Sequence, residues 1–468
     1  MPGFLKQYFF LAFALVFAST GSAPAWSAPD CSTMNTPILQ SVNPALQSNL
    51  LTPWQEEIDS AARDNGFTDK RGTAFLVSMN QADGLVPVTR TYHPGTHDFF
   101  WTTNPQSAAA YGYQPTTLVF YASPDNASGC DVPVYRFNKN GMHRYAVTPA
   151  DQAQLKADNW TADGVVFWAR ANPKFSIAIM PDTQMEVGVD GGGKDDKRFA
   201  QRTQWLADSR YTLNLQYVLH SGDVTNWGER DTPQLDMASE AIKRLEQVKL
   251  PYVLTVGNHD TRAVCAGGSA CPGEKAWETV RQLPAFNRYF NARFSNGGVA
   301  GQFAAGDLSN VYSTFEAGGL KWLVMSLELW PRAEVLTWAD GIIKSMPTRN
   351  VIIVTHSFLN SGGAIRADNG GYGVSSPATI YEKVIKYNPN VRFVFSGHEG
   401  NAARLVVPAG GNNAVAYLQA FHSATTNPVR IVEIDTDANT ATSFIAAPYT
   451  NETWDQYWSL DSNMKYVR

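Results

Sequence analysis

Charge is sparse in this chain, and the small net charge is acidic rather than basic. Charged residues make up 17% of the sequence, the formal net charge is −5 and the pI is about 5.9. A nucleic-acid surface needs clustered lysine and arginine, so we expect no nucleic acid as a structural partner. Aromatic residues, in contrast, are abundant, which suits a secreted protein rich in strands and loops.

Long apolar runs are missing after the N-terminus, so we do not expect the later sequence to span a membrane or the protein to be a transmembrane protein. The run Tyr8 to Ala18 follows Lys6 and precedes Ala23-Pro24-Ala25. A positive residue, an apolar stretch too short for a bilayer and an A-x-A motif together indicate a secretory signal peptide. We therefore predict a signal peptide over residues 1–28 and a secreted or periplasmic protein. A buried N-terminal helix is the alternative.

Cysteine is scarce, with four residues in the whole chain: Cys31, Cys130, Cys265 and Cys271. An even number in an exported chain suggests two disulfides. Cys265 and Cys271 bracket a glycine-rich loop and are the favoured pair, which leaves Cys31 with Cys130 by elimination. The sequence does not fix this pairing, and free buried thiols are the alternative.

The N-terminal third repeats itself. The segment Val86 to Arg90 reappears as Val132 to Arg136, and a weaker upstream copy spans Thr52 to Val77. Three copies predict a β-rich, pseudo-threefold domain over residues 29–172 whose units bury one shared core. His97 and His143 occupy equivalent repeat positions, which favours a structural role over a metal site.

Over about residues 45–170 this region resembles a repeat family of secreted bacterial proteins that is known mainly as a domain of unknown function. The resemblance implies a carbohydrate or cell-wall ligand as one option. Exposed Tyr and Trp side chains suit stacking on sugar rings, although core packing explains most of them equally well.

From Lys174 the pattern changes to alternating strands and helices, which predicts an α/β domain over 173–449 followed by a tail over 450–468. Apolar segments at Phe175–Met180, Leu215–His220 and Tyr252–Val256 are separated by amphipathic helical segments. This βαβαβ order implies a parallel sheet whose functional edge lies at the carboxyl ends of its strands.

Five apolar strands each end in Asp, Asn or His. The segments are Asp182-Thr183-Gln184, Gly222-Asp223 with Asn226, Gly257-Asn258-His259-Asp260, Thr355-His356 and Ser396-Gly397-His398. One such strand end is usually structural, but five in one order are hard to reach by chance. Carboxylates suit hard divalent cations, and imidazoles suit Mn, Fe, Ni or Zn. Two ions held together can activate water and clamp both oxygens of an in-line phosphoryl displacement.

This series of motifs resembles the calcineurin-like metallophosphoesterase superfamily, in its secreted Asp-x-Gln branch. The resemblance covers about residues 173–447 and implies an α/β fold, a two-sheet β-sandwich flanked by helices. It implies an enzyme that hydrolyses phosphate mono- or diesters by attack of metal-bound hydroxide. The cofactors would be two divalent ions, drawn from Mn, Fe, Zn, Mg or Ca.

The same resemblance implies a role for each motif residue. Asp223 would bridge the ions. One ion would also bind Asn258, His356 and His398, and the other Asp182 and Gln184. His259 would donate a proton to the leaving group. Apart from the resemblance, the adjacent Asp260 is a candidate to orient that imidazole through its second ring nitrogen.

Two positions depart from the family's pattern. The first motif usually reads Asp-x-His, and here position 184 is Gln; the last usually reads Gly-His-x-His, and here position 400 is Gly. Both missing histidines would serve the Asp182 ion, so we expect a weak second site that prefers Mg, Mn or Ca. His422 is a candidate substitute ligand, and an ordinary polar residue at a strand end is the alternative.

The substrate is not readable from the sequence. Candidate substrate-binding residues are Asn226, Arg366, Arg404 and His422, because arginine can pair with phosphate. The rival reading is a non-catalytic surface- or carbohydrate-binding protein with a degenerate phosphatase domain, which the two missing histidines favour. Retention of the other motif residues favours the enzyme.

Overall fold

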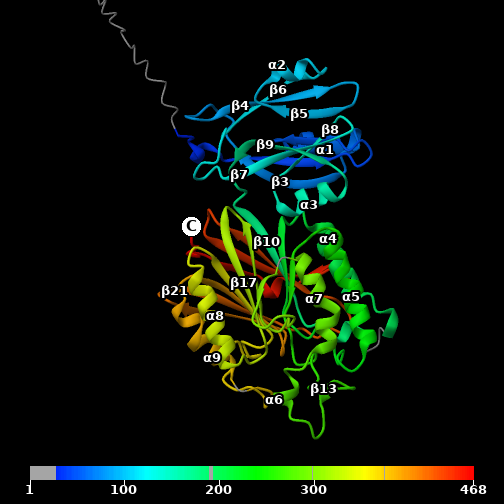
Figure 1. Ribbon diagram of the computed structural model, residues 1–468, viewed down its shortest axis with the longest axis vertical. Coiled ribbons are helices and arrows are strands. Elements are labelled where there is room, and N and C mark those ends of the chain that lie inside the picture. Colours follow the sequence, from blue (N-terminus) through cyan, green and yellow to red (C-terminus); the bar gives the residue numbers. More distant parts are fainter. Residues whose placement is uncertain (1–27, 189–192, 298, 374) are drawn as a thin grey trace, which may run out of the picture.

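The computed structural model describes residues 28–188, 193–297, 299–373 and 375–468, without the side chains of residues 194 and 292–297. The predicted signal peptide lies almost wholly outside the described residues. Figure 1 shows two parts, a smaller β-rich part formed by the N-terminal third and a larger mixed part below it. The chain passes between them after Ala169 and before Lys174, where the sequence predicts the domain boundary.

The N-terminal part contains three sheets of three strands, ordered β2-β1-β3, β5-β4-β6 and β8-β7-β9. Each sheet has its earliest strand in the middle, and a short helix precedes its last strand. The elements are β1 (Thr36–Val42), β2 (Asn49–Thr52), α1 (Gln55–Asp64), β3 (Asp69–Val77), β4 (Val86–His93), β5 (Asp98–Thr102), α2 (Pro105–Ala109), β6 (Gln114–Ala122), β7 (Val132–Lys139), β8 (Met142–Ala146), α3 (Pro149–Ala157) and β9 (Thr161–Ala169).

The last strand of each sheet contributes one phenylalanine to a common centre. Phe75, Phe120 and Phe167 are fully or almost fully buried, and their rings meet edge to face with centroids 5.5, 5.6 and 6.4 Å apart. Such aromatic contacts contribute beyond the apolar area they bury. His143 hydrogen-bonds the buried Asp98 through Nδ1 at 2.7 Å, a structural use of that histidine.

The C-terminal part is built on two seven-stranded sheets. One is ordered β12-β11-β10-β22-β23-β24 with β25 on β23, and the other β15-β16-β17-β18-β19-β21-β20. The strands are β10 (Lys174–Met180), β11 (Leu215–His220), β12 (Tyr252–Leu254), β15 (Val299–Gln302), β16 (Val311–Ala317), β17 (Leu320–Leu327), β18 (Asn350–Thr355), β19 (Val391–Ser396), β20 (Ala402–Ala409), β21 (Asn412–Gln419), β22 (Val429–Asp435), β23 (Thr440–Ala447), β24 (Glu452–Thr453) and β25 (Ser459–Asp461).

Helices flank the pair of sheets on both sides, as the sequence predicts (Figure 1). They are α4 (Arg198–Ser209), α5 (Thr232–Gln247), α6 (Ala276–Thr279), α7 (Pro284–Gly297), α8 (Ala333–Ser345) and α9 (Pro377–Lys383). Single 3-10 turns lie at Cys31–Thr33, Gln184–Glu186, Gly193–Asp195, Ile385–Tyr387 and Asp455–Tyr457. Helix α5 begins with Pro233 in its first turn, where the missing N–H needs no partner.

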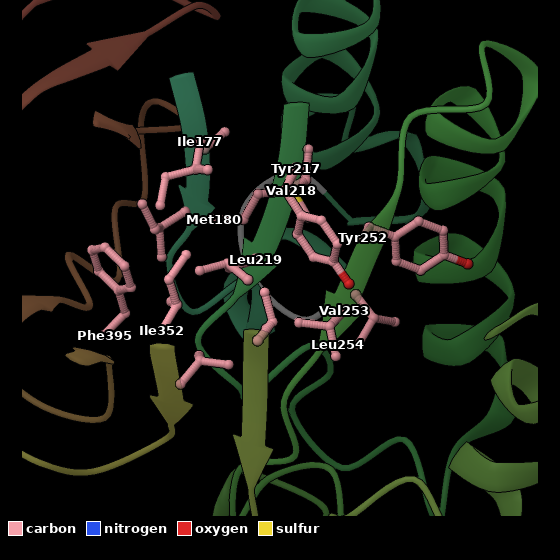
Figure 2. Packing of buried hydrophobic residues seen from close by; sticks show 14 of the residues in the cluster. Ile177, Met180, Tyr217, Val218, Leu219, Tyr252, Val253, Leu254, Ile352 and Phe395 are labelled. Atoms are coloured by element: carbon pink, nitrogen blue, oxygen red, sulfur yellow. The ribbon is translucent and has the colours of Figure 1, made fainter. Parts of the chain in front are cut away.

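The main core lies between the two sheets. Strands β10, β11 and β18 are buried along almost their whole length, which explains their continuous apolar sequences. Figure 2 shows side chains of β10 and β11 gathered with Ile352 and Phe395 of the second sheet. Three parallel strands of each sheet, β10, β11 and β12 in one and β17, β18 and β19 in the other, lie between this core and the helices.

The segment after Thr450 is part of the domain, so the prediction of a tail is wrong. Strand β25 pairs with β23, and Tyr466 lies 93% buried with its ring 5.7 Å from that of Trp322. The Tyr466 hydroxyl donates to the carbonyl of Thr440 at 3.0 Å. Isolated apolar residues in a polar segment give no periodic signal, and their binding surface exists only once the two sheets are in place.

Both predicted disulfides are present. Cys31 is bonded to Cys130, and Cys265 to Cys271. The second closes a hairpin between β13 (Val264–Cys265) and β14 (Ser269–Ala270), in the insert that follows the β12 loop. Within the described ranges no helix is long and apolar enough to cross a membrane.

Candidate metal centre

Three sequence-predicted ligands from different strands form one cluster. One ligand atom each from Asp223 (after β11), His356 (after β18) and His398 (after β19) lie within 4.8 Å of one another. His356 Nε2 lies 3.0 Å from Asp223 Oδ2, and its Nδ1–H donates to the carbonyl of Ser221 at 2.9 Å. Ligating histidines commonly donate their second N–H to a backbone carbonyl in this way, which leaves Nε2 for the ion.

Two further predicted ligands have an acceptor atom that nothing satisfies. Among the described residues, the side-chain carbonyl oxygens of Gln184 and Asn258 are buried and have no hydrogen-bond partner. A buried polar atom without a partner is costly, and such atoms in native proteins need an explanation. Divalent cations bind carboxylate, amide and imidazole donors of this kind, so the residues present fit a metal centre.

Asp182 lies beside this cluster. Its Oδ2 accepts the backbone N–H of His398 at 2.9 Å and lies 3.0 Å from Nε2 of His422. A Cβ at Gly397 would stand 2.0 Å from Asp182 Oδ1, and one at Gly257 would stand 2.1 Å from Asp223 Oδ1. Glycine precedes the donor residues of these two motifs because a ligand carboxylate passes directly over its backbone.

Backbone strain gathers at the same place. Asp223 has φ 53°, Trp330 φ 46° and His398 φ 80°, values that side-chain-bearing residues rarely adopt. Residues held in such conformations cluster at active sites and ligand sites, where the surrounding structure fixes them.

Comparison with known families agrees with this geometry. A model of the family described as calcineurin-like phosphoesterase matches residues 175–401, and one described as a domain of unknown function, DUF5648, matches residues 25–170. Residues 175–401 form a calcineurin-like phosphoesterase domain. The two-sheet fold of this domain and the β-rich N-terminal domain are as the sequence predicts. The DUF5648 match begins earlier than the predicted residue 45, at about the point where the signal peptide was expected to end.

Individual relatives are distant. The uncharacterized protein YvnB of Bacillus subtilis (strain 168) is 27% identical over 207 residues, 44% of this chain and 14% of that protein. The chain therefore spans about a seventh of the length of that curated relative. A crystal structure of a dimetal phosphatase from Danio rerio aligns with a TM-score of 0.41 and 12% identity, covering 62% of this chain and 98% of that one.

Charge in the phosphoesterase centre is balanced between Asp223 and His356. Burial alone would raise the pKa of Asp223, but the positive charge of His356 holds it well below its ordinary value. Burial would lower the pKa of His356, but the charges of Asp223 and Asp182 raise it to about 9. Burial, together with the charge of His356, lowers the pKa of His398 to about 3. Without metal, a protonated His356 thus neutralises Asp223, and His398 is already in the neutral form that binds metal.

The predicted proton donor His259 is held by Asn226. Its Nδ1 lies 2.8 Å from the backbone carbonyl oxygen and 2.7 Å from the side-chain oxygen of Asn226. Both partners are acceptors, so Nδ1 carries the hydrogen and Nε2 is the nitrogen available for chemistry. Nε2 lies 3.4 Å from the amide nitrogen of Gln184, at the metal centre. Asn226 is thus the residue that orients the imidazole, and its predicted contact with substrate stays a prediction.

Asp260 has a different partner set, so the prediction that it orients His259 is wrong. It is 99% buried, and its carboxylate accepts backbone N–H groups of Gly257, Val224 and Thr225 at 2.9 to 3.1 Å. These bonds tie the loop after β11 to the loop after β12. The Asp260 carboxylate, six residues after the end of β12, turns back onto its own loop, and the sequence cannot distinguish this from a contact with the imidazole.

The two arginines predicted to bind phosphate lie in different surroundings. Arg366 lies beside the centre: its guanidinium is 3.5 Å from Glu399, next to His398, and 5.9 Å from the Trp330 ring centre. Arg404, on β20, is bonded to the buried carboxylate of Asp461 on β25. The prediction that Arg404 binds substrate is therefore wrong, because β25 belongs to the domain and its Asp461 neutralises the guanidinium.

Trp330 is a residue at the centre that the sequence reasoning missed. It follows β17 and is fully buried, and its ring meets that of His398 at 5.6 Å and that of Tyr372 at 5.7 Å. Its position could have been predicted from the sequence, because it follows β17, which is parallel to β18 and ends at the same edge of the sheet. The residue was overlooked because tryptophan is not a metal ligand.

Proposed function

We propose that this protein is a secreted enzyme that hydrolyses phosphate mono- or diesters with two divalent ions. The observation that supports it most is the set of donors that follow strands of both sheets: Asp223, His356 and His398 together, with the unsatisfied buried oxygens of Gln184 and Asn258. Export is supported by the N-terminal signal pattern in the sequence and by two disulfides, which persist in oxidising compartments.

The two ions would have different donor sets. Asp223 with Asn258, His356 and His398 offers oxygen and nitrogen donors, a mixture that suits a transition ion. Asp182 with Asp223 and Gln184 offers oxygen donors, which suit Mg, Mn or Ca. Bound ions would activate a water molecule and neutralise charge on the phosphoryl oxygens.

The residues of the chain supply the proton and the orientation. Protonated His259 gives its Nε2 proton to the leaving oxygen, which turns an alkoxide into a neutral alcohol. Asn226 accepts the Nδ1 hydrogen throughout, so the ring stays in one orientation. The Gly257 and Gly397 turns keep the carboxylates of Asp223 and Asp182 close to the backbone. Arg366 is the remaining candidate for contact with a substrate phosphate.

Metal analysis combined with a hydrolysis assay tests this proposal. The purified protein should contain divalent metal and cleave 4-nitrophenyl phosphate, bis(4-nitrophenyl) phosphate or both, and chelation should stop turnover. Addition of Mn²⁺ should restore it. A metal-replete protein that cleaves neither ester would favour the rival, a non-catalytic binding protein. The carbohydrate or cell-wall ligand of the N-terminal domain stays a prediction from the sequence.

A further inference from the structure

The Asp182 side of the centre is short of donors from its own motifs. Gln184 provides one amide oxygen, and Gly400 provides no side chain. Position 400 also has no room for one: Gly400 has φ +71°, and a Cβ there would lie 2.9 Å from Cβ of Ser361. A ligand for this side must therefore come from another part of the chain.

His422 reaches this side from the neighbouring segment. Its Nε2 lies 3.0 Å from Asp182 Oδ2, and its side chain is 34% exposed. Two adjacent ligands of an octahedral ion with bonds near 2.1 Å are themselves about 3 Å apart, so this spacing suits a shared cation. The backbone N–H of Phe421 donates to the carbonyl of Gly400 at 3.2 Å. The imidazole thus arrives beside the position that lacks a side chain.

An unusual turn directs His422 to this point. The N–H of His422 donates to the carbonyl of Ala420 at 2.8 Å, which closes a three-residue turn around Phe421. Phe421 has φ 63° and His422 φ 43°, two consecutive left-handed residues with large side chains. Such γ-turns are rare and strained, and strain of this kind persists only where the surroundings hold it.

Neighbouring side chains hold the turn around Phe421 from two sides. The Phe421 ring packs 5.2 Å from that of Trp454 and 5.5 Å from that of Tyr457, both in the C-terminal segment. On the other side, Arg198 donates to the carbonyls of Met185, at 2.5 Å, and Ser423. These residues adjoin Gln184 and His422, so one buried guanidinium fixes both loops relative to each other.

We propose that His422 is a ligand of the ion held by Asp182, so that Asp182, Asp223, Gln184 and His422 form the second metal site. This rests on the proposed function only in requiring that an ion binds beside Asp182. An added imidazole shifts the preference of that site from Mg and Ca towards Mn, Fe or Zn. It also supplies the nitrogen donor that neither Gln184 nor Gly400 can offer.

Metal titration of the full-length protein tests the assignment without relying on activity. The metal-free protein is titrated with Mn²⁺ by calorimetry, and the bound ions are counted by mass spectrometry. The unaltered protein should bind two ions; His422→Ala should keep one at unchanged affinity and bind the other roughly 100-fold more weakly. Thr425→Ala, in an exposed position of the same loop, is the matched control and should bind both ions as the unaltered protein does.

A second readout covers the case in which His422→Ala is poorly folded. X-ray absorption of the unaltered protein loaded with Zn²⁺ should count three imidazoles for two ions, those of His356, His398 and His422. A count of two, or two ions bound equally well by His422→Ala, would show that His422 only hydrogen-bonds Asp182. An unaltered protein that binds a single ion would also overturn the assignment. A protein that binds two ions and hydrolyses no ester would refute the proposed function and leave the ligand assignment standing.

Discussion

Asn226→Ala should weaken proton donation by His259 without removing the imidazole. The side-chain oxygen of Asn226 lies 2.7 Å from His259 Nδ1, and the backbone carbonyl of the same residue lies 2.8 Å from it. Truncation to alanine removes the first acceptor and keeps the second. The ring therefore keeps its tautomer and loses part of the support for its charged form.

The size of the loss follows from the bond that is removed. A hydrogen bond to a charged group contributes about 1.5–3 kcal/mol, which corresponds to a roughly 10- to 150-fold fall in kcat/KM. Complete removal of the imidazole in His259→Ala should cost more, about 10²- to 10⁴-fold, the range of general acid catalysis. Both losses should be largest for alkyl phosphates, whose leaving oxygen needs the proton most.

The assay compares kcat/KM for a series of aryl and alkyl phosphates in the two variants and the unaltered protein. A 4-nitrophenyl ester, whose leaving group needs little protonation, should show a much smaller loss than a simple alkyl ester. Asn226→Asp keeps an oxygen at the same position and is the matched control. An equal loss for every leaving group, or no loss with alkyl esters, would show that His259 does not donate the proton, provided that the variants melt normally.

Four other outcomes are expected. Asp223→Asn should lose metal at both positions and nearly all hydrolysis, and full metal occupancy in that variant would refute the bridging role. In the metal-free protein, the raised pKa of His356 gives stability that is complete below about pH 6.5 and is lost as the pH rises through about 9. The melting temperature of the chelated protein should therefore fall as the pH rises across that window. The affinity for Mn²⁺ should rise over the same window, because metal displaces a proton. A melting temperature that does not change with pH would contradict this. Replacement of Cys265 and Cys271 by serine should cost about 2–3 kcal/mol in denaturant unfolding, given the short loop they close, and an unchanged midpoint would show that the bond does not stabilise. Tyr466→Ala should cost about 3–5 kcal/mol, whereas a loss below 1 kcal/mol would mean that the C-terminal segment is not part of the core.

The sequence by itself determined the order of a β-rich region and an α/β region and the strand-end motifs. These features are local: a buried strand reads as an apolar run, and the glycine and donor residues that follow it are adjacent in the chain. Asp223 belongs to the other sheet and reaches His356 and His398 only because the two sheets pack together. Within one sheet, parallel strands present their carboxyl ends at one edge, so the convergence of His356 and His398 follows from strand order alone. That reasoning needs no knowledge of side-chain conformation.

Only the tertiary structure decided which residues these side chains contact. Asp182 and His422 are 240 positions apart, and their contact depends on a strained turn that no local preference predicts. Arg404 is neutralised by a C-terminal strand whose sequence is too polar and short to reveal that it packs. Asn226 takes the orienting role expected of Asp260, because the paths of the two loops determine which acceptor meets the imidazole. Long-range contacts of this kind are set by how packed elements place their loops, and the sequence pattern within each element does not contain that information.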